Sequence, residues 1–137
     1  ATITPAAGYV TTKAAVFIGI LSSVVCYMAV NMKNKLGWDD ALDVWGVHGV
    51  GGVLGVILLG VFATTAVNAA GANGLWHGGA SFFFKQTLAV AGTAVYAFLF
   101  SYGMLFVINL FTPVKTGEKE EEVGLDEALH GETAYLH

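Results

Sequence analysis

His48 is the residue of this 137-residue chain best suited to chemistry, because it is an ionisable side chain inside a long apolar segment. Placing such a side chain in a membrane helix costs free energy, so it usually faces a cavity or a partner. In an apolar lumen, desolvation would favour the neutral ring over the imidazolium. A neutral ring suits the passage of a small polar molecule or a proton relay. The structural alternative is a histidine that only hydrogen-bonds a neighbouring helix.

Small residues surround His48. On an α-helical wheel one face of this segment carries Val44, His48, Gly51, Gly52 and Gly55. Gly51 and Gly55 also form the small-xxx-small pattern that lets neighbouring membrane helices approach closely. This face predicts a narrow apolar lumen better than a stripe that faces lipid.

Three carboxylates, Asp39, Asp40 and Asp43, precede this segment. A carboxylate at a helix start accepts hydrogen bonds from free amides and favours the positive end of the helix dipole. We therefore expect Asp43 to be the N-cap of a helix that begins there. We expect these residues to be helix caps and loop charges rather than catalytic groups. Acidic residues at the mouth of a pore would also concentrate cations.

The composition explains which elements must hold these residues. Hydrophobic residues make up 55% of the chain and charged residues 12%, against about a quarter charged in soluble domains. Uncharged stretches at 14–32, 44–84 and 86–114 are each close to or above the roughly 20 residues that span a bilayer core. The sequence therefore predicts an all-α integral membrane protein. Its expected parts are a membrane region at 1–112, with helices at about 13–33, 43–65 and 82–112, and a tail at 113–137.

The lysines predict the orientation, since short cytoplasmic loops carry the excess of basic residues. Lys33, Lys35, Lys115 and Lys119 lie on one side, which places the loop at Trp38 and the tail in the cytoplasm of a multi-pass protein in the cell membrane. Three helices are too few to enclose a wide site. The chain also starts without an initiator Met, and we therefore expect it to be part of a longer protein.

Several other functions find no support in the sequence. It shows no metal-ligand spacing, phosphate loop or Ser/His/Asp arrangement, so neither a cofactor nor an enzyme is predicted. The absence of arginine and the net charge of −4 argue against nucleic acid as a partner. Cys26 is most simply a small packing residue. A membrane anchor that binds haem through His48 would need a second axial ligand at similar depth, whereas His77 falls in a loop.

The tail after the charged run Glu118–Glu122 carries a short helical pattern. Leu125, Ala128 and Leu129 have i, i+3, i+4 spacing, and Gly131 is placed to end the helix. This pattern predicts a docking element of one or two turns.

Three motifs together resemble the ammonium transporter family. The first is the aspartate cluster followed by Gly46–Gly52, and the second is Ile3–Val10, similar to the segment ahead of that family's ninth helix. The third, similar to the family's cytoplasmic C-terminus, comprises Gly124–Asp126, His130–Glu132 and Ala134–Tyr135. The resemblance runs over nearly the whole chain and covers about the last third of such a protein.

The resemblance implies an eleven-helix, pseudo-two-fold transporter that forms homotrimers with one pore per subunit. The three helices would be the ninth, tenth and eleventh. His48 would be the second of twin pore histidines, along whose rings ammonium loses its proton, and Val44 would line the pore beside it. Asp40 and Asp43 would be the acidic residues at the cytoplasmic end of this helix. Trp45 departs from the family, in which phenylalanine is common at this position.

For the tail, the resemblance implies contact with a neighbouring subunit and control by a PII-type signalling protein. The tail residues concerned are Gly124, Leu125, Asp126, His130, Gly131, Glu132 and Tyr135. A Rhesus-type gas channel is the nearest alternative, but the tail resembles the ammonium-transporter branch. The haem-binding anchor and a purely regulatory or assembly segment are alternatives of other classes.

Overall fold

The computed structural model describes residues 1–132, and within this range it contains helices and no strand. Two compact units divide the chain, Ala1–Ala94 and Val95–His137, with the boundary inside the longest helix. The elements in order are η1 (Thr4–Ala6), α1 (Thr12–Leu36), η2 (Trp45–Val50), α2 (Gly51–Phe62), η3 (Leu75–His77), α3 (Ala80–Asn109), α4 (Glu118–Val123) and η4 (Asp126–His130).

Within residues 1–132, three segments are long and apolar enough to cross a membrane: Thr12–Leu36, Trp45–Phe62 and Ala80–Asn109. The all-helical membrane fold predicted from the sequence is therefore confirmed. The first helix continues three residues beyond the expected end at 33, and the second ends three residues before the expected 65. The division between a membrane region at 1–112 and a tail at 113–137 stays a prediction.

Local sequence explains the bounds of α1. The Thr11 hydroxyl accepts a hydrogen bond from the Ala14 amide at 3.3 Å and caps the start. At the other end Gly37 has a φ of 66°, a left-handed conformation that glycine adopts without steric strain, and its amide donates to the carbonyls of Lys33 and Asn34. Helix α1 therefore ends before Trp38.

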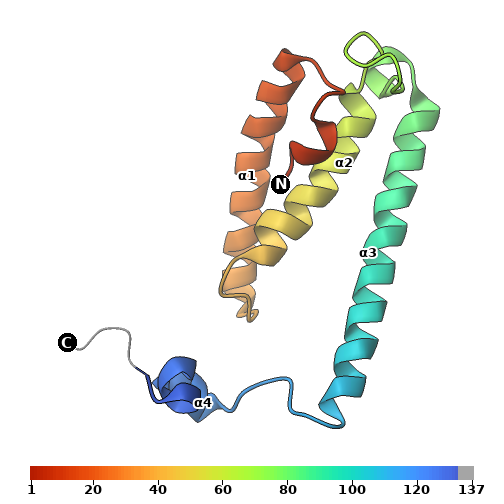
Figure 1. Ribbon diagram of the computed structural model, residues 1–137. Helices are drawn as coiled ribbons and strands as arrows, with labels where there is room; N and C mark the ends of the chain where they lie inside the picture. The colour runs from red at the N-terminus through yellow and green to blue at the C-terminus, as the bar shows by residue number, and fades with distance from the viewer. Residues whose placement is uncertain (133–137) are drawn as a thin grey trace. The chain divides into compact units, whose positions relative to one another are not determined.

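In the first unit, α1 and α2 run antiparallel, and the N-terminal segment with η1 lies between them (Figure 1). Ala6, Ile18 and Leu58 form the buried core, one from each of these three segments. Partly buried apolar side chains surround them, namely Val10, Leu21, Leu54, Leu59 and Phe62. The N-terminal segment is thus an integral part of the packing and sets the spacing of the two helices.

Glycines on α2 permit this close approach. A Cβ on Gly55 would overlap the carbonyl of Thr2, and a Cβ on Gly51 would lie 3.0 Å from the Thr2 hydroxyl oxygen and 3.2 Å from the Cys26 sulfur. The Ser22 hydroxyl on α1 donates to the Thr2 hydroxyl at 2.6 Å. The small-xxx-small pair therefore packs against this chain's own N-terminal segment, and Cys26 packs beside it.

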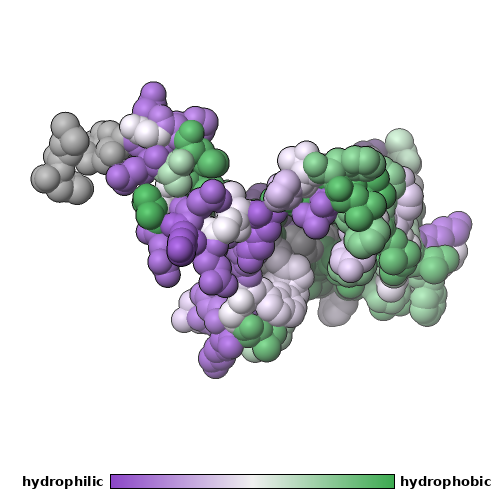
Figure 2. All heavy atoms as spheres, turned by 90° about the horizontal axis from the view of Figure 1, so that it is seen from below, coloured by the Kyte–Doolittle hydropathy of each residue, from purple (hydrophilic) through white to green (hydrophobic). Residues whose placement is uncertain are grey.

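Most large apolar side chains of the helices remain exposed, and α3 buries none of its residues. Figure 2 shows large hydrophobic areas on the surface of the helices. Such a surface is compatible with lipid or with further helices and incompatible with water.

The second unit includes a short helical tail. Glu120 accepts a hydrogen bond from the Gly117 amide at 3.0 Å and so closes the start of α4. In η4, Gly131 has a φ of 66° and its amide donates to the carbonyls of Asp126 and Glu127. The predicted helical turn with a C-terminal glycine is therefore confirmed.

Candidate functional site

His48 lies on the π-helical turn η2, which opens the second membrane-spanning segment. A π-turn accommodates one more residue than an α-turn and often marks a functional position. The imidazole is exposed and makes no hydrogen bond to any residue between 1 and 132. The structural alternative, in which His48 only ties two helices together, has no support within this part of the chain.

The single glycine-and-histidine face predicted by the α-helical wheel is wrong. Buried Gly46, Gly51 and Gly55 face α1 and the N-terminal segment, and a Cβ on Gly46 would lie 2.8 Å from a Val30 methyl carbon. These three glycines are spaced by five and then by four residues, because the π-turn adds one residue between the first two. We call them the packed face.

A second face of the same segment has little against it. Val44 and His48 are exposed, and a Cβ on Gly52 would meet no other atom within 4 Å. We call Val44, His48 and Gly52 the open face. The structure therefore separates the buried Gly51 and Gly55 from the exposed Val44 and His48, and a shared face for Val44, His48 and Gly52 stays a prediction.

The expected cap at Asp43 is also wrong, because Asp40 caps this helix. One carboxylate oxygen of Asp40 accepts from the Val44 amide at 2.9 Å, and the other accepts from the Trp45 amide at 2.8 Å. Asp43 has a φ of 54°, which lies outside the extended region typical of an N-cap residue. Only its main-chain carbonyl joins the helix, accepting from the Val47 amide at 2.9 Å.

The Asp43 carboxylate binds Lys33 instead. The Lys33 ammonium donates to Asp43 Oδ1 and to the Asp40 main-chain carbonyl, each at 2.6 Å. Lys33 is 5% exposed, which is rare for a lysine unless its charge is paired. From the sequence, Lys33 is expected only to mark the cytoplasmic side of the membrane. Its position inside the last apolar turn, followed by acidic residues, was the available signal.

Hydrogen bonding lowers the pKa of the Asp40 carboxyl group below its ordinary value of 3.8. The largest cause is the amide of Trp45, opposed by partial desolvation and reinforced by the amide of Val44 and the charge of Lys33. Asp40 is therefore ionised at neutral pH. Its negative charge is already bound by the amides of Val44 and Trp45 at the start of the helix.

Aromatic rings flank the same turn. Trp38 and Trp45 meet edge to face, with ring centroids 5.0 Å apart. This contact gives Trp45, the position that departs from the family pattern, a definite role in closing the turn between α1 and the second span. Aromatic packing and the Asp40 cap thus act on the same few residues.

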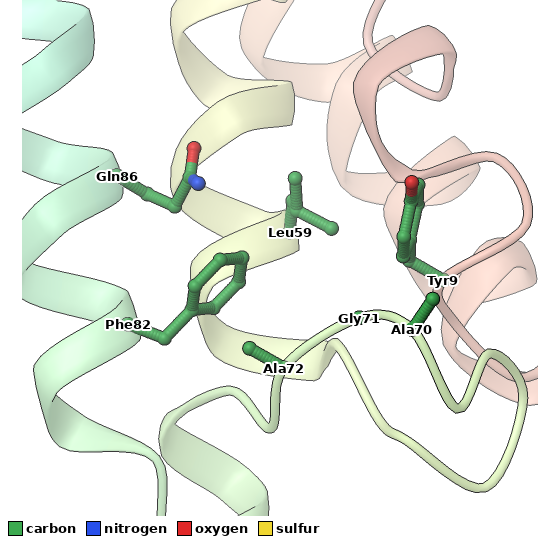
Figure 3. A pocket seen from close by; sticks show the side chains of 7 residues that line it. All are labelled: Tyr9, Leu59, Ala70, Gly71, Ala72, Phe82 and Gln86. Atoms are coloured by element: carbon green, nitrogen blue, oxygen red, sulfur yellow. The ribbon is translucent and has the colours of Figure 1, made fainter.

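Two hollows in the first unit do not include His48 among their lining residues. One, of about 420 Å³, is formed by Leu59 on α2, Phe82 and Gln86 on α3, Tyr9, and the loop residues 70–72, whose side chains point toward one another in Figure 3. The other, of about 490 Å³, is apolar and lies beside Trp45, Val53 and Ala94. Neither brings an ionisable side chain to the open face.

The remaining predicted site residues belong to the second unit. Gly124, Leu125, Asp126, His130, Gly131 and Glu132 are all in or next to η4, whereas Tyr135 lies outside the described residues. Leu125 and Leu129 are exposed. In the first unit, His77 lies in η3, within the loop before α3, as expected.

The helices and the histidine-bearing open face define a polytopic membrane protein, and comparison with known proteins identifies the family. Residues 1–135 match the Ammonium Transporter Family. The chain is 49% identical to the ammonium transporter of Bacillus subtilis over 134 residues, which are 97% of this chain and 33% of that protein. It is 39% identical to the ammonium transporter Amt1 of Archaeoglobus fulgidus over 98% of this chain and 34% of that protein.

A solved structure agrees with these relatives. The crystal structure of Saccharomyces cerevisiae Mep2 superposes with a TM-score of 0.81 at 33% identity, covering 93% of this chain and 30% of that one. The chain belongs to the ammonium transporter family, a family of transporters and not of enzymes. It spans about a third of the length of the curated relatives that it matches.

Proposed function

We propose that this chain takes part in ammonium or ammonia transport across the cell membrane, as one portion of a pore. The observation that carries the proposal is an ionisable residue on the open face of an otherwise apolar span, in a chain 49% identical to a named ammonium transporter. Further helices would cover the open face and complete the path. Uptake of ammonium would serve nitrogen metabolism.

His48 is the residue proposed to act on the substrate. An apolar path disfavours a bare ammonium ion, so the ion gives up a proton and continues as ammonia. A neutral imidazole accepts or relays that proton and donates a hydrogen bond to the uncharged molecule. Val44, on the same open face, lines the path beside it.

Asp40 and Asp43 have a structural role at the mouth of this path. Their carboxylates are occupied, one by the amides of the helix start and the other by Lys33. This arrangement favours a structural role over direct attraction of cations, because each carboxylate already makes a contact of the fold.

Assembly and regulation extend the proposal. The complete protein forms a homotrimer in the bilayer, with the tail in the cytoplasm. The tail, which includes Gly124–Glu132, docks on a neighbouring subunit and responds to a PII-type protein. Exposed Leu125 and Leu129 on a closed helical turn support a docking role. Binding of a PII-type protein to the trimer, with and without residues 124–137, tests this part.

His48→Ala in the complete protein tests the proposed transport mechanism. We expect altered charge carried per methylammonium and weaker selectivity against potassium. The measurements are isotope uptake and current in proteoliposomes. The proposal fails if uptake, charge coupling and selectivity all stay unchanged. A Rhesus-type gas channel would move substrate without current, and a haem-binding anchor would show a Soret band in the visible spectrum of the purified protein.

A further inference from the structure

Lys33 stands apart from the other charged residues between positions 1 and 132, because it is the only one whose side chain is buried. Burying an ammonium group is unfavourable unless its charge is paired and its hydrogen bonds are made. Such a residue near the end of a membrane helix would normally extend to the interface. Its inward orientation therefore calls for a specific partner.

Those partners lie across the turn that follows α1. Lys33 donates to the Asp40 carbonyl and the Asp43 carboxylate, each at 2.6 Å, and so ties the end of α1 to residues seven and ten positions further on. Charge-assisted bonds of this length are among the stronger ones in proteins. The Lys33 side chain therefore holds both ends of the turn from Asp40 to Asp43.

The same turn begins the span that carries His48. The Asp40 carbonyl, which binds Lys33, also accepts a hydrogen bond from the Asp43 amide at 3.2 Å and so closes the turn. The Asp40 carboxylate caps the amides of Val44 and Trp45. Asp43 holds a left-handed backbone conformation, with a φ of 54°, that persists only where the surroundings impose it. The Asp43 carbonyl then accepts the first hydrogen bond of the helix, from Val47.

We propose that Lys33 is a positioning residue for His48: by holding the Asp40–Asp43 turn it sets where the π-turn begins and so the direction of the imidazole on the open face. This inference rests on the proposed role of His48 in the pore. Without the ammonium group, Asp43 leaves its left-handed conformation and the start of the span rotates. His48 follows, because it lies five residues beyond Asp43, within about one π-turn.

Lys33→Met tests the inference in the complete protein in proteoliposomes, with charge carried per methylammonium as the readout. We expect this ratio and the selectivity against potassium to shift in the same direction as in His48→Ala. Lys33→Arg, which keeps the charge and two donors, restores most of the ratio. Lys35→Met, two residues away on the exposed side of α1, leaves it unchanged.

A structural control separates positioning from folding. Ile18→Ala removes a fully buried core side chain far along α1 from the turn, so it lowers stability and leaves the ratio unchanged. A ratio that shifts equally in Ile18→Ala and Lys33→Met overturns the inference. If Lys33→Met yields no folded protein, Asp43→Ala replaces it, because alanine removes the carboxylate that pairs with Lys33 and disfavours the left-handed conformation. We then expect a smaller shift in the same direction, and an unchanged ratio overturns the inference.

The outcomes also separate the inference from the proposed function. An unchanged ratio in Lys33→Met together with a shifted ratio in His48→Ala overturns the positioning role alone. An unchanged ratio in both variants contradicts the role of His48 itself, and the inference fails with it.

Discussion

The packed face and the open face of the second span show how one helix serves two tasks. Gly46, Gly51 and Gly55 bring α1 and the N-terminal segment into contact with its backbone. Val44 and His48, on the open face, are exposed instead. The difference shows that the packing within this chain is complete on one side of the helix. The other side leaves Val44 and His48 uncovered by the residues between 1 and 132.

The strongest test of this contrast places the same large side chain on each face. Gly55→Leu would collide with the Thr2 carbonyl, which is backbone and unable to move aside, so we expect a cost above about 4 kcal/mol and no folded protein. At Gly52 a Cβ meets nothing within 4 Å, so Gly52→Leu should leave folding intact, but it should block uptake. Size-exclusion chromatography in detergent and methylammonium uptake measure the two effects. Normal uptake in a folded Gly52→Leu protein would contradict the open face as the substrate path.

A smaller effect is expected from truncation within α1. Ile18 is fully buried, and Ile18→Ala should lower the free energy of unfolding by about 2–5 kcal/mol, because the core cannot collapse fully around the gap. Ile20→Ala is the matched control, because Ile20 is 63% exposed. If lipid covers this side chain, the free energy of unfolding should fall by less than about 1 kcal/mol. Denaturant titration in mixed micelles gives both values. Equal costs would mean that further helices pack on α1 as closely as this chain does.

The sequence predicted the three membrane helices, because hydrophobic length alone decides them. It also predicted the helical turn that ends at Gly131. It failed at the start of the second span, where the α-helical wheel assumed a regular repeat and Asp43 had the composition of a cap. The π-turn and the Lys33–Asp43 pair depend on contacts between α1 and the turn after it, and the sequence signals the pair only through a lysine in the last apolar turn that acidic residues follow.

Acidification tests the start of the span, where the two faces are set. The pKa of Asp40 is lowered in the folded protein, so its carboxylate stabilises the fold above its ordinary pKa of 3.8. This stabilisation is lost as the pH falls through the lowered value. Asp40→Asn keeps one of the two acceptor oxygens, whereas Asp40→Ala keeps neither.

For these Asp40 variants we expect thermal midpoints at pH 7 in the order wild type, Asp40→Asn, Asp40→Ala, with differences of a few degrees. Both variants should show a weaker loss of stability than the wild type as the pH falls below about 4. Thermal unfolding in detergent between pH 3 and pH 7 measures this. Parallel curves for all three proteins would mean that the charge of Asp40 does not hold the helix start.

The smallest effect is expected in the tail. Leu125 and Leu129 are exposed there, as Val44 and His48 are on the open face, and local hydrogen bonds close the turn that carries them. Gly131→Ala forces a Cβ into a backbone with a φ of 66°, at a cost of about 1–2 kcal/mol. Gly117→Ala is the matched control, because Gly117 has a φ of −72°, which alanine adopts freely. Hydrogen exchange of the amide at position 131 should be faster only in Gly131→Ala. Equal protection in both variants would mean that contacts beyond this turn hold it, so that its apolar side chains are already covered.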